Sequence, residues 1–259
     1  MKRKLQNTTY KIAPLLALTV IALIWLFVCE GDIVPSFMLP SPIDVFTAFI
    51  KDMPILLTHA QITLQEALYG LLIGIALAFV IASLMDRFKF LYNAFYPLLV
   101  VSQTIPTVAI APLLVLWMGF EMTPKIALVV ITTFFPITIG LLDGFRSVDS
   151  DQINLMRSMK ASKLQTFFIV KIPTALPSFF AGLKISASYA IVGAVIAEWL
   201  GGFEGLGVYM TRVKKAYAFD KMFAVIIFIC IISLLLILLV TVIQRVATPW
   251  VQRSKRKIN

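Results

Sequence analysis

Long apolar runs separated by short polar segments dominate the pattern of the chain. A helix needs about 20 residues to cross a bilayer core about 30 Å thick. Six runs reach or approach that length: 12–28, 63–85, 91–118, 126–142, 178–199 and 222–246. The pattern therefore predicts an all-α, polytopic membrane protein with six transmembrane helices. We expect a single transmembrane domain over residues 1–259, with its core at about 60–246.

Prolines interrupt the third and fourth runs. Pro97, Pro106 and Pro112 lie in the third and Pro136 in the fourth. A proline inside a helix removes a backbone N–H and clashes with the preceding turn. We therefore expect kinked or broken helices, whose freed carbonyl groups face neighbouring helices or a cavity.

The segment 149–177 is polar and basic, unlike the rest of the chain. Asp149 and Ser162 are each followed three residues later by a glutamine, which is the spacing of helix N-terminal caps. Apolar residues recur after each cap at three- and four-residue steps, so two short amphipathic helices joined by a tight turn are predicted. Pro173 and Pro177 are expected to end the second helix. Such a pair fits a groove on a soluble partner better than it fits lipid.

Composition and charge support a membrane location. Hydrophobic residues make up 60% of the 259 residues and charged residues 14%, and the net charge is +10. In such a chain an excess of basic over acidic residues indicates cytoplasmic loops rather than nucleic-acid binding. If both termini are cytoplasmic, the inner segments carry 16 of the 23 basic residues. We therefore expect a multi-pass protein of the cell membrane whose polar segment 149–177 faces the cytoplasm.

The sequence lacks the motifs of an ATPase or a metalloenzyme. It contains no GxxxxGK[ST] loop, and its single histidine, His59, cannot form a cluster of ligands. Cys29 and Cys230 are isolated in apolar runs and are expected to be packing residues. The chain is therefore predicted not to be an enzyme and to bind no cofactor or metal itself. If it is a pump, a separate subunit must hydrolyse ATP.

The stretch MKASKLQTFFIVKIPTALPSFFAGLK at 159–184 resembles the "EAA" signature of importer-type ABC permeases. Five residues match the signature: Ala161, Ser162, Pro173, Ala175 and Pro177. Two depart from it, Lys160 at the usual turn glycine and Ile172 at the usual leucine. The segments LPSP at 39–42, AEWLGG at 197–202 and GLG at 205–207 are similar to the branch that imports nitrate, sulfonates, taurine and thiamine precursors.

The resemblance implies a permease subunit that works as a homodimer. It implies two ATPase subunits, which hold ATP and Mg²⁺, and an extracytoplasmic solute-binding protein. The helix pair at about 149–172 would receive the ATPase, through coupling residues Asp151, Met156, Met159, Lys160, Ala161, Ser162, Lys163, Leu164, Phe167, Phe168, Pro173 and Pro177. A lysine in the left-handed turn costs about 1 kcal/mol, so we expect that turn to be opened or shifted.

A translocation path is predicted around the break at Pro106. Its candidates are Ser102, Gln103, Thr104, Thr107, Thr132, Thr133 and Glu198. The hydroxyl groups could equally bond their own helices. Glu198 fits either a cavity or gate position or an interfacial residue that orders the turn at 201–202. Glu66 is expected to be an interfacial residue that snorkels, and the small residues of the fifth run favour close packing, including across a dimer seam.

A second class of transporter shares these features. An ion-coupled secondary transporter would also have broken helices, but it needs ionisable residues at mid-membrane, for which only Glu198 and Lys184 are candidates. For the substrate, the aromatic and hydroxyl side chains fit a small organic anion and a heteroaromatic precursor equally well, and the resemblance to this branch implies a thiamine pyrimidine precursor or a sulfonate- or nitrate-like anion.

Overall fold

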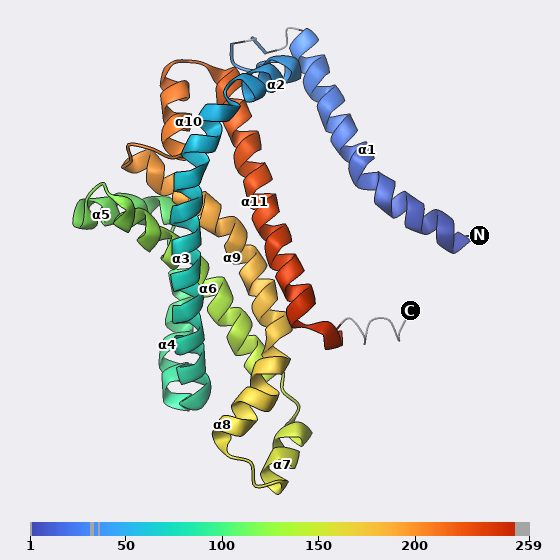
Figure 1. Cartoon of the computed structure of the whole chain (residues 1–259), viewed down its shortest axis with the longest axis vertical. Coiled ribbons are helices and arrows are strands. Elements are labelled where there is room, and N and C mark those ends of the chain that lie inside the picture. The colour runs from blue at the N-terminus through green and yellow to red at the C-terminus, as the bar shows by residue number, and fades with distance from the viewer. Residues whose placement is uncertain (1, 32–33, 36, 252–259) are drawn as a thin grey trace. The chain divides into compact units, whose positions relative to one another are not determined.

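The computed structural model describes residues 2–31, 34–35 and 37–251, and this part of the chain is helical, without β-strands (Figure 1). The elements are α1 (Lys2–Glu30), α2 (Pro42–Lys51), α3 (Met53–Arg87), α4 (Lys89–Ser102), α5 (Thr107–Met118), α6 (Met122–Arg146), α7 (Ser150–Ser158), α8 (Lys163–Thr166), the π-helix η1 (Phe167–Lys171), α9 (Ile172–Leu200), α10 (Leu206–Lys215) and α11 (Phe219–Ala247). The all-α class is confirmed.

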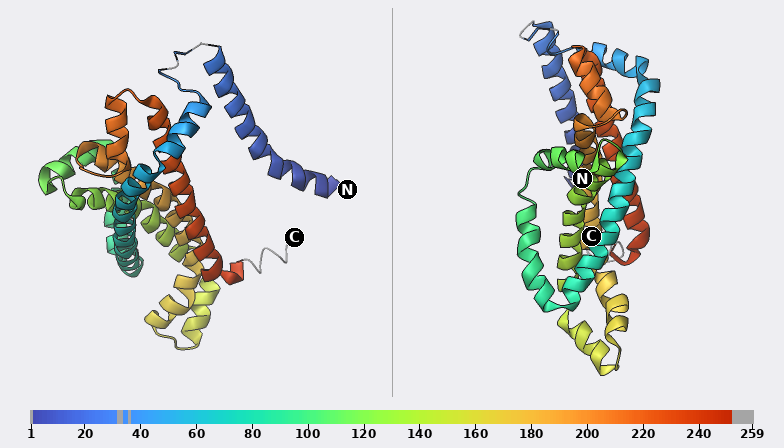
Figure 2. Two further views of the ribbon diagram at one scale, coloured as in Figure 1. Left: turned by 45° about the horizontal axis from the view of Figure 1, so that its top comes forward. Right: turned by 90° about the vertical axis from the view of Figure 1, so that its left-hand side faces the viewer.

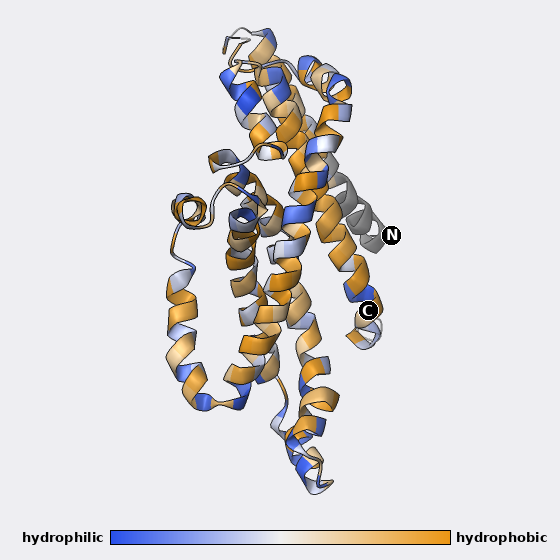
Figure 3. Ribbon diagram, turned by 60° about the vertical axis from the view of Figure 1, so that its left-hand side comes forward, coloured by the Kyte–Doolittle hydropathy of each residue, from blue (hydrophilic) through white to orange (hydrophobic). Residues whose placement is uncertain are grey.

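The expected number of membrane spans is not confirmed. Within the described residues, four helical stretches are long and apolar enough to cross a bilayer: α3, α6, α8 to α9, and α11. The bent pair α4 and α5 makes a fifth if it is counted as one span, and the described apolar part of α1, Leu16–Glu30, is shorter. Figure 3 shows apolar residues along these helices, as expected of surfaces that meet lipid.

Contacts divide the chain into two compact units. The first comprises Met1–Thr58 and Tyr209–Phe228, and the second His59–Val208 and Ile229–Asn259. In the first unit, Val45 and Ala48 of α2 pack against Ala224 of α11. The start of α2 is capped by Ser41, whose hydroxyl accepts the N–H of Asp44 at 3.2 Å. The LPSP segment therefore ends where an N-capped helix begins.

A polar contact also holds the first unit together. Asp52, which lies between α2 and α3, accepts a hydrogen bond from the Tyr209 hydroxyl and pairs with Lys221 at 2.9 Å. Burial alone would raise the pKa of Asp52, but the hydrogen bond from Tyr209 and the charge of Lys221 outweigh it and lower the pKa below its usual value of 3.8. The ionised carboxylate is therefore the form that stabilises this unit.

We expect Asp52→Asn to lower stability at pH 7 by about 2 kcal/mol, the usual contribution of a hydrogen bond to a charged group. Because the folded-state pKa of Asp52 is lowered, the stabilisation is present above pH 3.8 and is lost as the pH falls through the folded-state value. Thermal unfolding in detergent at several pH values measures this. The difference between wild type and variant should shrink on acidification, and a difference independent of pH would contradict the assignment.

Two helices of the second unit, α6 and α9, pack with their backbones close together. A Cβ added at Gly140 would lie 2.7 Å from the Ser178 carbonyl oxygen, and one at Gly144 would lie 2.6 Å from the Cα of Ala175. The Ser186 hydroxyl donates a hydrogen bond to the Thr133 carbonyl at 2.8 Å. The small-residue face of α9, considered for a dimer seam, thus packs against α6 of the same chain.

The break in the third apolar run is confirmed. The axes of α4 and α5 bend by 100°, and the chain between them ends at Pro106, which is the N-cap residue of α5. Figure 2 shows α4 and α5, in green, meeting at this corner. Pro97, Pro112 and Pro136 lie inside helices instead. The break therefore belongs to the segment 103–106, and Gln103 and Ile105 of this segment line a pocket.

Candidate translocation pocket and coupling segment

The coupling segment consists of α7, α8 and η1, and its two predicted caps are confirmed. Asp149 accepts the N–H of Asp151 at 3.0 Å and begins α7. Ser162 begins α8 with a reciprocal capping box, in which its hydroxyl accepts the Gln165 N–H and its own N–H donates to Gln165 Oε1 at 2.7 Å. These local bonds fix two helix starts in a stretch with little buried apolar surface.

The turn between the two helices is closed, so the expectation of an opened turn was wrong. Lys160 has φ +56°, the left-handed conformation that the usual glycine would adopt. The N–H of Ala161 donates to the Met156 carbonyl at 2.9 Å, and the N–H of Lys160 donates to the Arg157 carbonyl at 2.9 Å. These bonds satisfy the last carbonyl groups of α7 and offset the cost of the conformation.

The second helix does not end at the prolines, contrary to expectation. The chain continues from α8 through η1 into α9 without interruption. The N–H of Ile172 bonds to the carbonyl of Phe167, five residues earlier, which is the spacing of a π-turn. Pro173 then falls in the first turn of α9, where a missing N–H is tolerated, and Pro177 lies inside α9.

The coupling segment presents apolar side chains to solvent. Five of them are exposed: Leu155, Met159, Leu164, Phe168 and Ile169. Phe167, by contrast, is half-buried and its ring lies 5.4 Å from that of Phe145 at the end of α6. Met159, Leu164 and Phe168 were singled out as coupling residues, whereas Leu155 and Ile169 were predicted only as members of the helix pair at about 149–172. An exposed apolar patch of this kind is typical of a surface that binds another protein.

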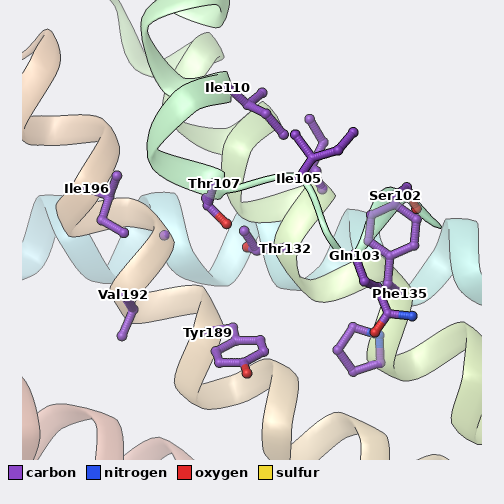
Figure 4. A pocket seen from close by; sticks show the side chains of 13 residues that line it. Ser102, Gln103, Ile105, Thr107, Ile110, Thr132, Phe135, Tyr189, Val192 and Ile196 are labelled. Carbon is purple, nitrogen blue, oxygen red and sulfur yellow. The ribbon is translucent and has the colours of Figure 1, made fainter. Parts of the chain in front are cut away.

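A pocket of about 350 Å³ lies at the corner between α4 and α5, against α6 and α9. Figure 4 shows the side chains that line it. They are Ser102, Gln103, Ile105, Thr107, Ile110, Ile131, Thr132, Phe135, Pro136, Tyr189, Val192, Gly193 and Ile196. None of these residues is charged. Its polar side-chain groups are one amide and four hydroxyl groups, and the rings of Phe135 and Tyr189 also line it.

Four of the residues predicted for a translocation path lie together in this pocket: Ser102, Gln103, Thr107 and Thr132. Thr104, Thr133 and Glu198 do not line it. Thr104 donates to the carbonyl of Val101 at 2.7 Å, and Thr133 is buried and bonds to that of Val129 at 2.8 Å.

The contribution of α9 to the pocket was missed. Tyr189, Val192, Gly193 and Ile196 follow the spacing i, i+3, i+4 and i+7, which places them on one face of a helix. That periodicity is visible in the sequence. Because every face of this helix is apolar or small, however, nothing distinguished the pocket-lining face from the others.

Buried charges join α3, α6 and α9 away from the pocket lining. Lys125 Nζ lies 2.9 Å from Glu66 Oε1, and both side chains are at least 94% buried. The expectation that Glu66 snorkels at an interface was wrong, because a cation near the start of α6 compensates its charge inside the protein. Glu66 Oε2 has no hydrogen-bond partner among the described residues.

Glu198 connects the start of α10 to α3 through hydrogen bonds. It accepts hydrogen bonds from the Thr63 hydroxyl and the Gly207 N–H, both at 2.6 Å, and it is 98% buried. Thr63 in turn accepts the N–H of Leu206 at 2.9 Å. A side chain on Gly205, which has φ +122°, would collide with the Glu198 carboxylate. This arrangement shares only the ordering role with the interfacial interpretation of Glu198, because the side chain is buried and the residues it orders are 205–207, around the start of α10, rather than 201–202.

Comparison with known proteins gives consistent matches. Residues 70–253 match the family model described as binding-protein-dependent transport system inner membrane component. The chain is 38% identical over 223 residues to a probable ABC transporter permease protein of Haemophilus influenzae, covering 86% of this chain and 91% of the relative. It is 35% identical over 251 residues to the formylaminopyrimidine transport permease protein ThiX of Halalkalibacterium halodurans, covering 96% of this chain and 98% of the relative.

A solved structure supports the fold. The MetNI methionine ABC transporter, in an inward-facing conformation, matches with a TM-score of 0.66 and 18% sequence identity, over 76% of this chain and 97% of that one. At this identity the likeness concerns the fold alone.

Proposed function

The chain belongs to the family of binding-protein-dependent transport system inner membrane components, and from this premise we propose that its pocket passes a small, uncharged heteroaromatic solute, such as a thiamine pyrimidine precursor. It is a permease subunit of an ABC importer, and ATP hydrolysis takes place on a separate subunit. The family also implies a solute-binding protein as a partner.

The uncharged lining of the pocket carries this proposal. An aminopyrimidine is planar and neutral and offers both donors and acceptors, which the Gln103 amide and the Thr107 hydroxyl can pair. The Thr132 hydroxyl donates to carbonyl groups of its own helix, at 3.1 Å and 3.0 Å, and can still accept a hydrogen bond from the solute. The rings of Phe135 and Tyr189 suit contact with a flat aromatic solute. A relative that is 35% identical over nearly the whole chain is named for formylaminopyrimidine transport.

A sulfonate- or nitrate-like anion is the second candidate, favoured by one feature of the pocket. Thr107 begins α5, and no side chain caps the N–H groups of that first turn. An uncapped helix N-terminus carries partial positive charge and attracts anions. Without a lysine or arginine in the lining, however, an anion would have only this partial charge to replace its hydration.

The expected partners fit the exposed surfaces. The patch of Leu155, Met159, Leu164, Phe168 and Ile169 on the coupling segment is proposed to receive the ATPase. Ile185, Tyr189 and Val192 of α9 are exposed beside the pocket, which supports a homodimer in which a second copy covers them. The distribution of basic residues supports cytoplasmic termini and a cytoplasmic coupling segment.

ATP-driven uptake into proteoliposomes tests the function. The permease, its ATPase and its binding protein are reconstituted, and uptake of labelled formylaminopyrimidine is compared with that of an alkanesulfonate. We expect pyrimidine uptake that requires ATP and the binding protein. Gln103→Leu and Thr132→Val should each reduce it at least fivefold, because each removes a polar group from the pocket.

Thr241→Val on α11 is the matched control, since its hydroxyl bonds only to the Ile237 carbonyl among the contacts described. It should leave uptake unchanged. Uptake of sulfonate in place of pyrimidine would support the second candidate, and uptake without ATP would favour an ion-coupled carrier.

A further inference from the structure

We propose that the ion pair between Lys171 and Asp86 transmits movement of the coupling segment to the corner between α3 and α4, and through α4 to the wall of the pocket. Lys171 and Asp86 are then positioning residues for transport. The inference rests on the proposed docking of an ATPase on the coupling segment, and it assigns a role to residues outside both the docking patch and the pocket.

The geometry of the ion pair is the first observation. Lys171 Nζ lies 2.7 Å from both carboxylate oxygens of Asp86, so one ammonium group bridges the whole carboxylate. The two residues are 85 positions apart in the sequence, and their side chains are 25% and 15% exposed. A partly buried, bidentate pair of this kind is stronger and more directional than an exposed surface pair.

Lys171 occupies a position that must move with the coupling segment. It is the last residue of η1, which continues α8 directly and leads into α9. Phe167 at the other end of η1 contacts Phe145, and Gly144 packs against Ala175, so this stretch is bound tightly to the end of α6. Displacement of α8 would therefore be carried by η1 and the ends of α6 and α9 together.

Asp86 lies where that displacement can reach the pocket. It is the last residue but one of α3, and Phe88, two residues later, is the N-cap residue of α4. A helix of 14 residues is about 20 Å long and nearly rigid. The far end of α4 carries Ser102, and Gln103 follows it, both in the pocket lining. A shift at the Asp86 corner would therefore move one wall of the pocket.

A second contact steadies the same corner. The guanidinium carbon of Arg146, at the end of α6, lies 3.7 Å from the centroid of the Tyr92 ring on α4, and Tyr92 stacks on Tyr96 at 4.8 Å. This cation–π contact keeps the base of α4 beside α6. The ion pair between Lys171 and Asp86 connects η1 to α3, whereas the cation–π contact connects α6 to α4.

A π-helix lies at the junction between α8 and α9, and Lys171 is its last residue. Its wide turn replaces the usual bonds to the fourth preceding residue, and such turns are frequent at functional sites. The π-turn lets the Lys171 side chain reach sideways to α3 while the helix continues.

Coupled transport with charge-exchange variants tests the proposal. In the reconstituted complex of permease, ATPase and binding protein, we expect Asp86→Asn and Lys171→Met each to lower the number of solute molecules moved per ATP hydrolysed at least fivefold. ATPase co-purification should stay at the wild-type level. The exchange variant D86K/K171D should recover at least half of the lost coupling ratio, because it restores an ion pair in reversed order.

Lys89→Met is the matched control. It removes a lysine at the same corner, and Lys89 is exposed and makes no ion pair within the described residues. Coupling ratios for Asp86→Asn and Lys171→Met no lower than that of Lys89→Met would overturn the proposal, as would an exchange variant no better than the single variants. Loss of ATPase co-purification in the single variants would also overturn it, since the pair would then shape the docking surface. ATP-independent uptake by the wild type would refute the proposed function instead, which separates the two failures.

Discussion

Lys125→Met is expected to destabilise the protein by about 3–5 kcal/mol, because it leaves Glu66 buried without its cation. The Glu198 carboxyl group interacts with Glu66, so two acids would remain together in a site that excludes water. For a chain of this length, such a loss corresponds to a fall in Tm of roughly 6–20 °C. Thermal unfolding in detergent, followed by the loss of monodisperse protein, measures it.

Two further variants isolate the ion pair from other effects of the substitution. The double variant K125M/E66Q removes both charges and should recover most of the lost stability, since neutral groups of similar size cost far less to bury. Lys215→Met removes an exposed lysine of α10 and should change stability by less than about 0.5 kcal/mol. If K125M/E66Q is as unstable as Lys125→Met, packing rather than charge accounts for the loss.

Local signals in the sequence were sufficient for the two helix starts of the coupling segment and for the break in the third apolar run. The caps at Asp149 and Ser162 lie where the spacing of polar residues placed them, because a cap is defined by residues within one turn of the chain. The break before α5 coincides with Pro106 for the same reason. Four of the predicted path residues meet in one pocket because they flank this break or lie opposite it on α6.

Long-range partners had no local signal. Lys125 and Glu66 are 59 residues apart, and hydropathy alone placed Glu66 near a membrane surface. Only the packing of α3 against α6 shows that the two charges compensate each other in the interior. The prediction from Pro173 was wrong for a related reason, since the π-turn that accommodates this proline departs from regular helix geometry without a local signal in the residue pattern.

The helix α6 connects the three features of the second unit. Lys125 lies in its first turn within the buried charge network, Thr132 and Phe135 line the pocket in its middle, and Arg146 lies at its end beside the coupling segment. Its close contact with α9 through Gly140 and Gly144 makes the pair a rigid body. Movement imposed at one end would therefore reach the pocket without requiring either helix to deform.

Leu164→Asp and Phe168→Asp are each expected to reduce ATPase co-purification at least a hundredfold. Both side chains are more than 60% exposed, so the permease itself should fold normally. In the proposed complex they would be covered by the ATPase, and a carboxylate placed there would be desolvated without a partner. A loss of about 3 kcal/mol in binding corresponds to that factor. Pull-down of the ATPase by tagged permease measures it.

Tyr217→Asp supplies the matched control, because Tyr217 is 79% exposed and lies in the turn between α10 and α11, outside the coupling segment. Its φ of +57° is one that aspartate tolerates, so the backbone should not be disturbed. It should retain the ATPase at the wild-type level. Retention by Leu164→Asp and Phe168→Asp, with monodisperse protein of unchanged Tm, would move the docking surface away from α8 and η1 and leave Leu155 of α7 and Met159, which follows α7, as the remaining candidates.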